Sequence, residues 1–176
     1  MKFGNGGVAM RILGIDPGLA IVGWGVIDYE KAKIRPVAYG AIRTPQGIPT
    51  EERLSMIYDG MNQLIEKYHP DEMSIEELFF TNNITTGIRV AEARGVSLLA
   101  AKRANLPMQE YTPMQVKQAV VGYGKAEKKQ VIAMVTSLLG LKEPPKPDDT
   151  ADALAIAICH AHSGASRLAP YFNKRI

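Results

Sequence analysis

The order of its short apolar segments is what most limits the folds open to this 176-residue chain. Three segments with the character of strands follow one another at hairpin-like spacings, at residues 11–16, 22–29 and 33–44. Two more, at residues 72–79 and 106–112, are separated by helical patterns. This order predicts an α/β fold in which a five-stranded mixed sheet carries helices on both faces.

Helical patterns fill the remaining segments up to residue 164. The first helix is expected over residues 49–69, where apolar residues form one stripe and Pro70 ends the pattern. Thr112 and Pro113 occupy the N-cap and N1 positions of the third helix, and Gly140 ends the fourth. The second and fifth helices are expected over residues 85–105 and 148–164.

The composition fits a single packed domain, because apolar residues make up 46% of the chain and charged residues 22%. No apolar run approaches the roughly 18 residues that a membrane span needs. The single cysteine, Cys159, has no partner in the chain for a disulfide, so we expect a cytoplasmic protein without membrane association. We expect residues 11–165 to form the domain. Residues 1–10 are predicted to be a disordered tail, an expression remnant or an upstream start, and residues 166–176 a C-terminal tail.

Acidic residues occur at three places where a folded chain has no general need of them. Asp16 ends the first apolar strand, and Glu76 and Glu77 lie near the end of the fourth. Asp149 and Asp152 are three residues apart at the start of an alanine-rich helix, so they share one face of it. Because strand ends beside a sheet crevice are where α/β proteins place their sites, these acids are candidates for one common site.

Such a group of acids would favour a particular chemistry. Several carboxylates buried together are costly unless a cation neutralises them. Hard divalent ions such as Mg²⁺ bind carboxylate oxygens and keep positions for water and substrate phosphate. Two such ions would activate a water and stabilise the leaving oxygen at a phosphodiester.

Each acid taken alone also has a purely structural interpretation. Asp16 before Pro-Gly fits a turn-capping residue, and the two glutamates fit an edge strand that faces water. Asp148 fits a plain N-cap, a task that Asp149 would share, and Asp152 fits an acid that complements the helix dipole. Only the fold decides whether these residues meet.

Basic residues gather in the middle of the chain. Residues 86–135 hold 8 Lys and Arg against 3 Asp and Glu, whereas residues 1–85 hold 8 against 11. A basic segment beside a few acids would hold a polyanion over a metal site, although a solvated helical face produces the same pattern.

Five stretches together resemble the bacterial RuvC Holliday junction resolvases, from about Arg11 to His162. These stretches are RILGIDPGLAIVGWGVID, SIEELFF, EARGVSLLAA, QVKQAVVGYGKAEKKQV and DDTADALAIAICHAH. The resemblance implies a ribonuclease H-like fold, a homodimer and paired, symmetric, Mg²⁺-dependent nicking of four-way DNA junctions in recombination and repair. The nicks would leave ligatable 5′-phosphate and 3′-hydroxyl ends.

The resemblance also assigns roles to individual residues. The catalytic and metal-binding positions are Asp16, Glu76, Asp149 and Asp152, with two Mg²⁺ ions per site and Mn²⁺ as a substitute. Glu77 falls one residue late and would project to the opposite face of the strand. The positions that face DNA are Phe79, Lys117 and Lys128, with Lys125 and Lys129 as helpers. A core position for Phe79 and a solvated helical face for Lys117 are the alternatives.

The implied partners are four-way junction DNA, a second copy of the chain and the RuvA-RuvB branch-migration complex. The helix from Arg89 to Ala104 would pack against its twin, or else only onto its own sheet. Actin-like ATPases and sugar kinases share the GID-x-G start but need a second lobe and a longer chain. A nuclease of the pre-ribosomal RNA processing type shares only the first strand. A non-catalytic branched-DNA binding protein would have no need of four acids beside phosphates.

Overall fold

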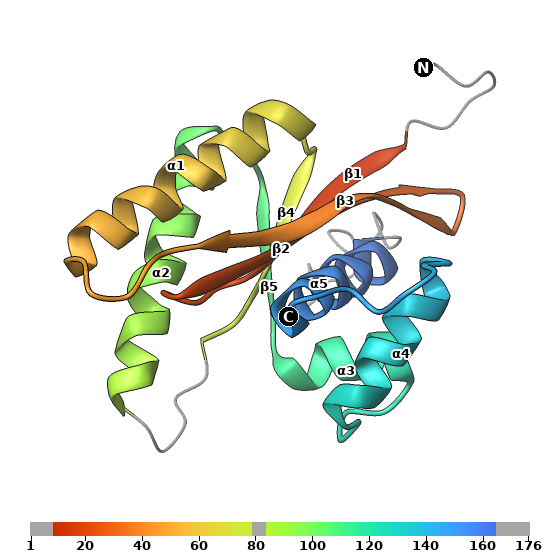
Figure 1. Ribbon diagram of the computed structural model, residues 1–176. Coiled ribbons are helices and arrows are strands. Elements are labelled where there is room, and N and C mark those ends of the chain that lie inside the picture. The colour runs from red at the N-terminus through yellow and green to blue at the C-terminus, as the bar shows by residue number, and fades with distance from the viewer. Residues whose placement is uncertain (1–8, 79–83, 165–176) are drawn as a thin grey trace, which may run out of the picture.

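The computed structural model describes residues 9–78 and 84–164, and these residues form one sheet flanked by helices (Figure 1). The elements are β1 (Met10–Asp16), β2 (Ile21–Glu30), β3 (Lys33–Arg43), α1 (Thr50–Tyr68), β4 (Glu72–Glu76), α2 (Ile84–Arg103), β5 (Met108–Tyr111), α3 (Pro113–Val121), α4 (Lys128–Leu138) and α5 (Asp148–Gly164). The predicted order of strands and helices is therefore confirmed. Within the described ranges no helix is both long and apolar enough to cross a membrane.

The sheet is mixed, as predicted, with the strand order β3-β2-β1-β4-β5. β1, β2 and β3 pair antiparallel, and β4 and β5 run parallel to β1, because helical crossovers lead into them. β4 ends at Glu76 rather than at the predicted residue 79, since its neighbour β5 ends opposite it at Tyr111. β1 begins at Met10, one residue earlier than expected, and Met10 is buried.

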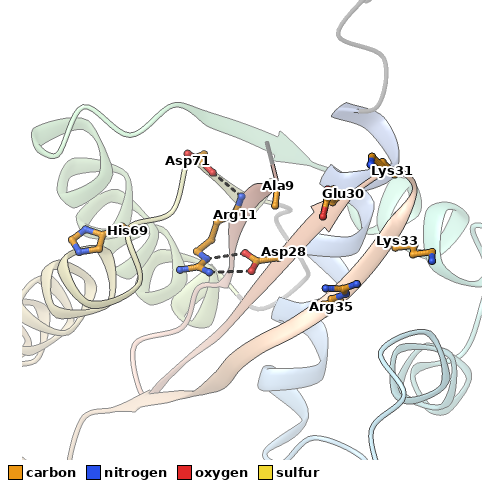
Figure 2. A pocket seen from close by; sticks show the side chains of 9 residues that line it. All are labelled: Ala9, Arg11, Asp28, Glu30, Lys31, Lys33, Arg35, His69 and Asp71. Atoms are coloured by element: carbon orange, nitrogen blue, oxygen red, sulfur yellow. Dashed lines mark hydrogen bonds and ion pairs between the residues drawn. The ribbon is translucent and has the colours of Figure 1, made fainter. Parts of the chain in front are cut away.

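Arg11 fixes the amino end of β1 (Figure 2). Its guanidinium donates to the two carboxylate oxygens of Asp28 at 2.8 and 3.0 Å, and to the carbonyl oxygen of Tyr68 at 3.0 Å. Its backbone N–H donates to a carboxylate oxygen of Asp71 at 2.7 Å. These contacts hold the central strand at the end opposite to Asp16.

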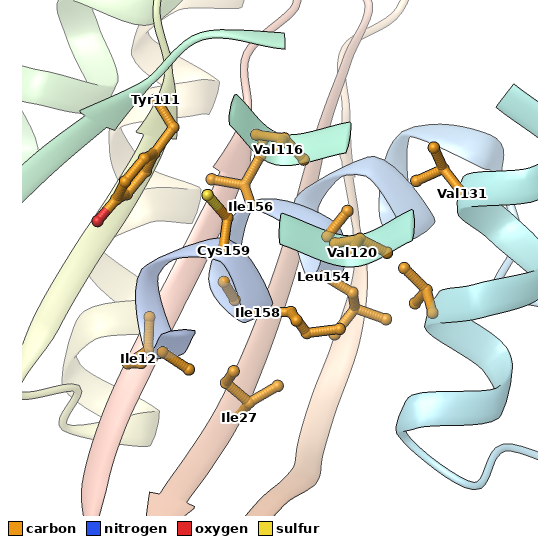
Figure 3. Close-up of a cluster of buried hydrophobic side chains, with 14 of the residues drawn as sticks. Ile12, Ile27, Tyr111, Val116, Val120, Val131, Leu154, Ile156, Ile158 and Cys159 are labelled. Atoms are coloured by element: carbon orange, nitrogen blue, oxygen red, sulfur yellow. The ribbon is translucent and has the colours of Figure 1, made fainter. Parts of the chain in front are cut away.

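Helices cover both faces of the sheet, as predicted: α1 and α2 lie on one side and α3, α4 and α5 on the other (Figure 1). β1 is buried on both faces, so adjacent residues enter different cores: Leu13 packs under α1 and α2, and Ile12 packs against α5. The core around Ile12 includes Ile27 of β2 and Leu154 and Ile158 of α5 (Figure 3). This double burial explains the continuous apolar run before Asp16.

Helix α5 lies very close to the sheet because glycines on β1 and β2 leave room for it. A methyl group at Gly14 would overlap the carbonyl oxygen of Ala153, and one at Gly23 would overlap the carbonyl oxygen of Asp149. The hydroxyl of Thr150 donates to the carbonyl oxygen of Gly40 on β3 at 3.1 Å. The first turn of α5 is thereby brought to the carboxyl end of β1.

Candidate active site

Strand register places two of the predicted acids side by side. Ile15 of β1 pairs with Ile75 of the parallel strand β4, so the residues that follow, Asp16 and Glu76, end adjacent strands. Ile15 and Ile75 belong to the core under α1 and α2. Because side chains alternate along a strand, Asp16 and Glu76 face the opposite side, where α5 lies. Glu77 is exposed, which agrees with its expected place outside the acid group.

A cavity of about 200 Å³ collects five of the predicted residues. These residues are Asp16, Glu76, Asp152, Lys117 and Lys128. Its walls are Pro113, Val116, Val131, Ala155 and Ile156. This cavity has apolar walls and receives one charged side chain from each of five elements: β1, β4, α3, α4 and α5.

The other predicted residues lie outside this cavity. Asp149 is half-buried and lines an adjoining cavity, but its charge acts on both Asp16 and Asp152. Lys125 is exposed, and Lys129 is exposed and forms an ion pair with Glu127 at 3.0 Å. Phe79 falls outside the described residues.

The acids in the cavity resist ionisation. Burial raises the pKa of Asp16 from 3.8 to about 8, and the charges of Asp152, Glu76 and Asp149 act in the same direction. Burial also raises the pKa of Glu76 and of Asp152, and each is raised further by a neighbouring aspartate. Ionisation of these acids is therefore not fully compensated by the protein's own positive charges.

Lys128 compensates part of this charge. Its Nζ lies 3.0 Å from Oδ2 of Asp152 and 3.8 Å from Oδ2 of Asp148. Burial lowers the pKa of Lys128, but the hydrogen bond to Asp152 and the charges of the aspartates outweigh this effect and the pKa is raised. Lys128 in turn lowers the pKa of Asp16 and, together with Lys117, that of Glu76.

The donor set fits a hard divalent cation. No three Asp, Glu, His or Cys side chains in the described part of the chain are already arranged as a metal cage. The acids nevertheless offer only carboxylate oxygens, and they raise one another's pKa because their negative charges lie close together. A divalent ion bound among them would favour their ionised forms, and carboxylate oxygens are the ligands that Mg²⁺ and Mn²⁺ prefer.

Arg94 supports this site and was not identified from the sequence. Its Nε donates to the backbone carbonyl oxygen of Glu76 at 3.1 Å, and its guanidinium forms an ion pair with Glu110 of β5. Arg94 thereby ties α2 to the ends of β4 and β5. No local pattern marks such a residue, because the contact joins segments that only the tertiary fold brings together.

A mixed sheet with acids at the ends of its central strands, and further acids at the start of a helix packed across them, defines the class of metal-dependent nucleases with a ribonuclease H-like fold. A family model described as Crossover junction endodeoxyribonuclease RuvC matches residues 12–160. The chain belongs to the RuvC family of crossover junction endodeoxyribonucleases.

Individual relatives agree with this assignment. The crossover junction endodeoxyribonuclease RuvC of Brevibacillus brevis is 62% identical over 152 residues, which cover 86% of this chain and 92% of the relative. The structure of T. thermophilus RuvC in complex with Holliday junction substrate superposes with a TM-score of 0.83 at 38% identity, covering 88% of this chain and 94% of that one. The yeast mitochondrial Holliday junction resolvase Ydc2, at 17% identity and a TM-score of 0.67 over 93% of this chain and 84% of its own, shares the fold. The predicted fold, family and enzyme class are confirmed.

Proposed function

We propose that this protein cuts four-way DNA junctions by paired, symmetric nicks that depend on Mg²⁺. The observation that carries the proposal is the cavity in which Asp16, Glu76 and Asp152 meet Lys117 and Lys128. Acids that bind divalent ions and lysines that bind phosphate are what a phosphodiester requires at one place. Among relatives, T. thermophilus RuvC was solved with a Holliday junction.

The four acids have the proposed role of holding the metal. Asp16 and Glu76 would hold it from the rigid ends of β1 and β4, and Asp149 and Asp152 from the first turns of α5, at two ions per site with Mn²⁺ as a substitute. Bound there, the ions supply the positive charge that activates a water and stabilises the leaving 3′ oxygen. The products would carry 5′-phosphate and 3′-hydroxyl ends, which a ligase seals.

The cations of α3 and α4 have the proposed role of positioning the strand to be cut. Lys117 and Lys128 line the cavity and would contact phosphates next to the acids. Lys125 and Lys129 are exposed and would extend this contact along the DNA backbone. Phe79, three residues after Glu76, would stack on a base near the junction centre.

A homodimer would place one site on each of two strands, because a twofold axis relates both the subunits and the cuts. α2 supports this part of the proposal. It buries Ala93 and Ala100 against its own subunit, yet it exposes 69% of Ile84 and 51% of both Ile88 and Leu99. A second copy would cover these side chains. The RuvA-RuvB complex would deliver junctions to the dimer in the cytoplasm.

The test is cleavage of an end-labelled synthetic four-way junction in Mg²⁺. Wild-type protein should make symmetric nicks, and Asp16→Asn and Glu76→Gln should lower the rate at least about a hundredfold while junction binding is retained. Glu77→Gln is the matched control, since Glu77 neighbours Glu76 but lies outside the cavity. Wild-type protein that binds the junction and cuts it in neither Mg²⁺ nor Mn²⁺ would refute the proposal.

A further inference from the structure

A second cavity, of about 640 Å³, is lined by one of the four acids, Asp149, and by neither Lys117 nor Lys128. Its lining comes from the turn after β1 (residues 18–21), the loop before α1 (residues 46–48), the first turns of α1 and α2, and Asp149. Asp149 also acts electrostatically on Asp16 and Asp152. The four acids are therefore shared between two cavities, and only the smaller one contains Lys117 and Lys128.

Arg53 makes this second cavity chemically unusual. Arg53 lines it, yet the residue is only 9% exposed. Its Nε donates to the hydroxyl oxygen of Thr44 at 2.8 Å, and that hydroxyl donates to the carbonyl oxygen of Leu19. No Asp or Glu among the described residues forms an ion pair with Arg53. A buried guanidinium held by a neutral hydroxyl is costly, and an anion in the cavity would offset that cost.

Other groups around the cavity favour the same kind of ligand. Arg89, near the start of α2, also lines it and forms no ion pair with any described carboxylate. Thr50 begins α1, where no side chain caps the helix, so backbone N–H groups of the first turn remain available to an anion. Glu51 and Glu52 follow in that turn, but they are exposed and do not line the cavity.

The charged cavity at the other end of the sheet, around Arg11, differs in this respect. There the cations stand among acids, and Arg11 is paired with Asp28 (Figure 2). None of the described cations that line it is buried, and the cavity lies at the amino end of β1, whereas Asp16 lies at the carboxyl end. Arg35, an exposed arginine of β3 that lines it, is a suitable control for the experiment below.

We infer that the cavity around Arg53 and Arg89 binds a backbone phosphate of the junction strand that is cut, close to the cut. The inference rests on the proposed function. A strand that crosses the acids would then be held by Lys117 and Lys128 on one side and by the two arginines on the other. Arg53 and Arg89 act as positioning residues, because they would hold the strand at a phosphate beside the acids without touching the reacting atoms.

The first experiment measures binding of a labelled four-way junction in EDTA over a series of salt concentrations. Arg89→Ala and Arg53→Gln should each weaken binding at low salt by about three- to tenfold and reduce the slope of log K against log salt by about 0.9. Arg35→Ala should leave both quantities unchanged. Because Arg53 is buried, thermal unfolding of Arg53→Gln and of the charge-retaining Arg53→Lys is measured in parallel. If neither Arg53 variant folds, the binding and salt dependence of Arg89→Ala alone test the inference, because Arg89 is exposed.

The second experiment locates the phosphate. Junctions with a single uncharged methylphosphonate at successive linkages around the cut should show one linkage at which wild-type affinity falls and Arg89→Ala suffers no further loss. Failure to find such a linkage, or variants that match wild type at every salt concentration, overturns the inference and leaves the proposed function intact. Wild-type protein that binds but never cuts overturns the proposed function instead. Absence of junction binding by wild-type protein overturns both.

Discussion

Asp16 carries an electrostatic cost that follows from its position at the end of a central strand. Its pKa of about 8 in the folded protein lies above the 3.8 of an exposed aspartate, which is the value expected after unfolding. The folded state therefore binds more protons than the unfolded state between these values. The contribution of the Asp16 carboxyl to the stability of the folded state is therefore most favourable below about pH 3.8, and it is lost as the pH rises through about 8.

Replacing Asp16 by Asn should consequently stabilise the protein at high pH. In EDTA at pH 9 we expect Asp16→Asn to raise the free energy of unfolding by at least about 1.4 kcal/mol, the equivalent of one unit of pKa, and to raise it less at pH 5. Urea unfolding at both pH values measures this. Mg²⁺ should raise the melting temperature of wild type more than that of the variant. A variant less stable than wild type at pH 9 would contradict the assignment.

Lys128 and Lys129 are neighbours with different tasks. Lys128 lowers the pKa of both Asp16 and Glu76, whereas Lys129 is paired with Glu127 in solvent. We expect Lys128→Ala to reduce junction cleavage at pH 7 about tenfold and to shift the pH–rate profile upward, because the acids then ionise less readily. Lys129→Ala should cost about threefold or less and leave the profile in place. Equal profiles for the two variants would contradict this distinction.

At the scale of elements, the site depends on how closely α5 approaches β2. A methyl group at Gly23 would meet the backbone of Asp149, which has no freedom to move aside, whereas one at Gly25 would meet mainly the flexible side chain of Leu154. We expect Gly23→Ala to destabilise the protein by at least about 3 kcal/mol and Gly25→Ala by about 1–2 kcal/mol. Urea unfolding compares them. Similar losses for both would show that α5 is less tightly fixed than described.

The same elements show how far sequence reasoning reaches. The succession of strands and helices along the chain follows from the apolar pattern, which is local. The meeting of Asp16 with Glu76 depends on the pairing of β1 with β4, and the early end of β4 depends on where β5 stops, so neither follows from local sequence. The cavity around Arg53 was also missed, because its hydrogen bond to Thr44 and that residue's bond to Leu19 join α1, the segment after β3 and the turn after β1. The family resemblance, and not the spacing alone, separated Lys128, which lines the acid cavity, from its helper Lys129, which lies outside it.

At the scale of the whole molecule, the described part of one chain contains one acid site, yet a resolved junction needs two coordinated cuts. The exposed apolar side chains of α2, Ile84, Ile88 and Leu99, are the feature of the described structure that a second copy would cover. Burial of such side chains stabilises an association by about 25 cal/mol for each Å² removed from water. A charge placed among them should therefore separate the subunits without disturbing the acid cavity.

Ile88→Glu tests this arrangement, with Leu138→Glu on α4 as the matched exposed control. Sedimentation velocity should show a dimer for wild type and the control, and a monomer for Ile88→Glu at micromolar concentration, because the buried carboxylate would cost several kcal/mol. On a circular DNA that extrudes a cruciform, the dimer should make two cuts within one binding event and yield linear product. The monomer should cut strands independently, so nicked circles should accumulate first. Linear product formed at the wild-type rate by a monomeric Ile88→Glu variant would contradict the dimer, because coordinated cutting would then need no second subunit at α2.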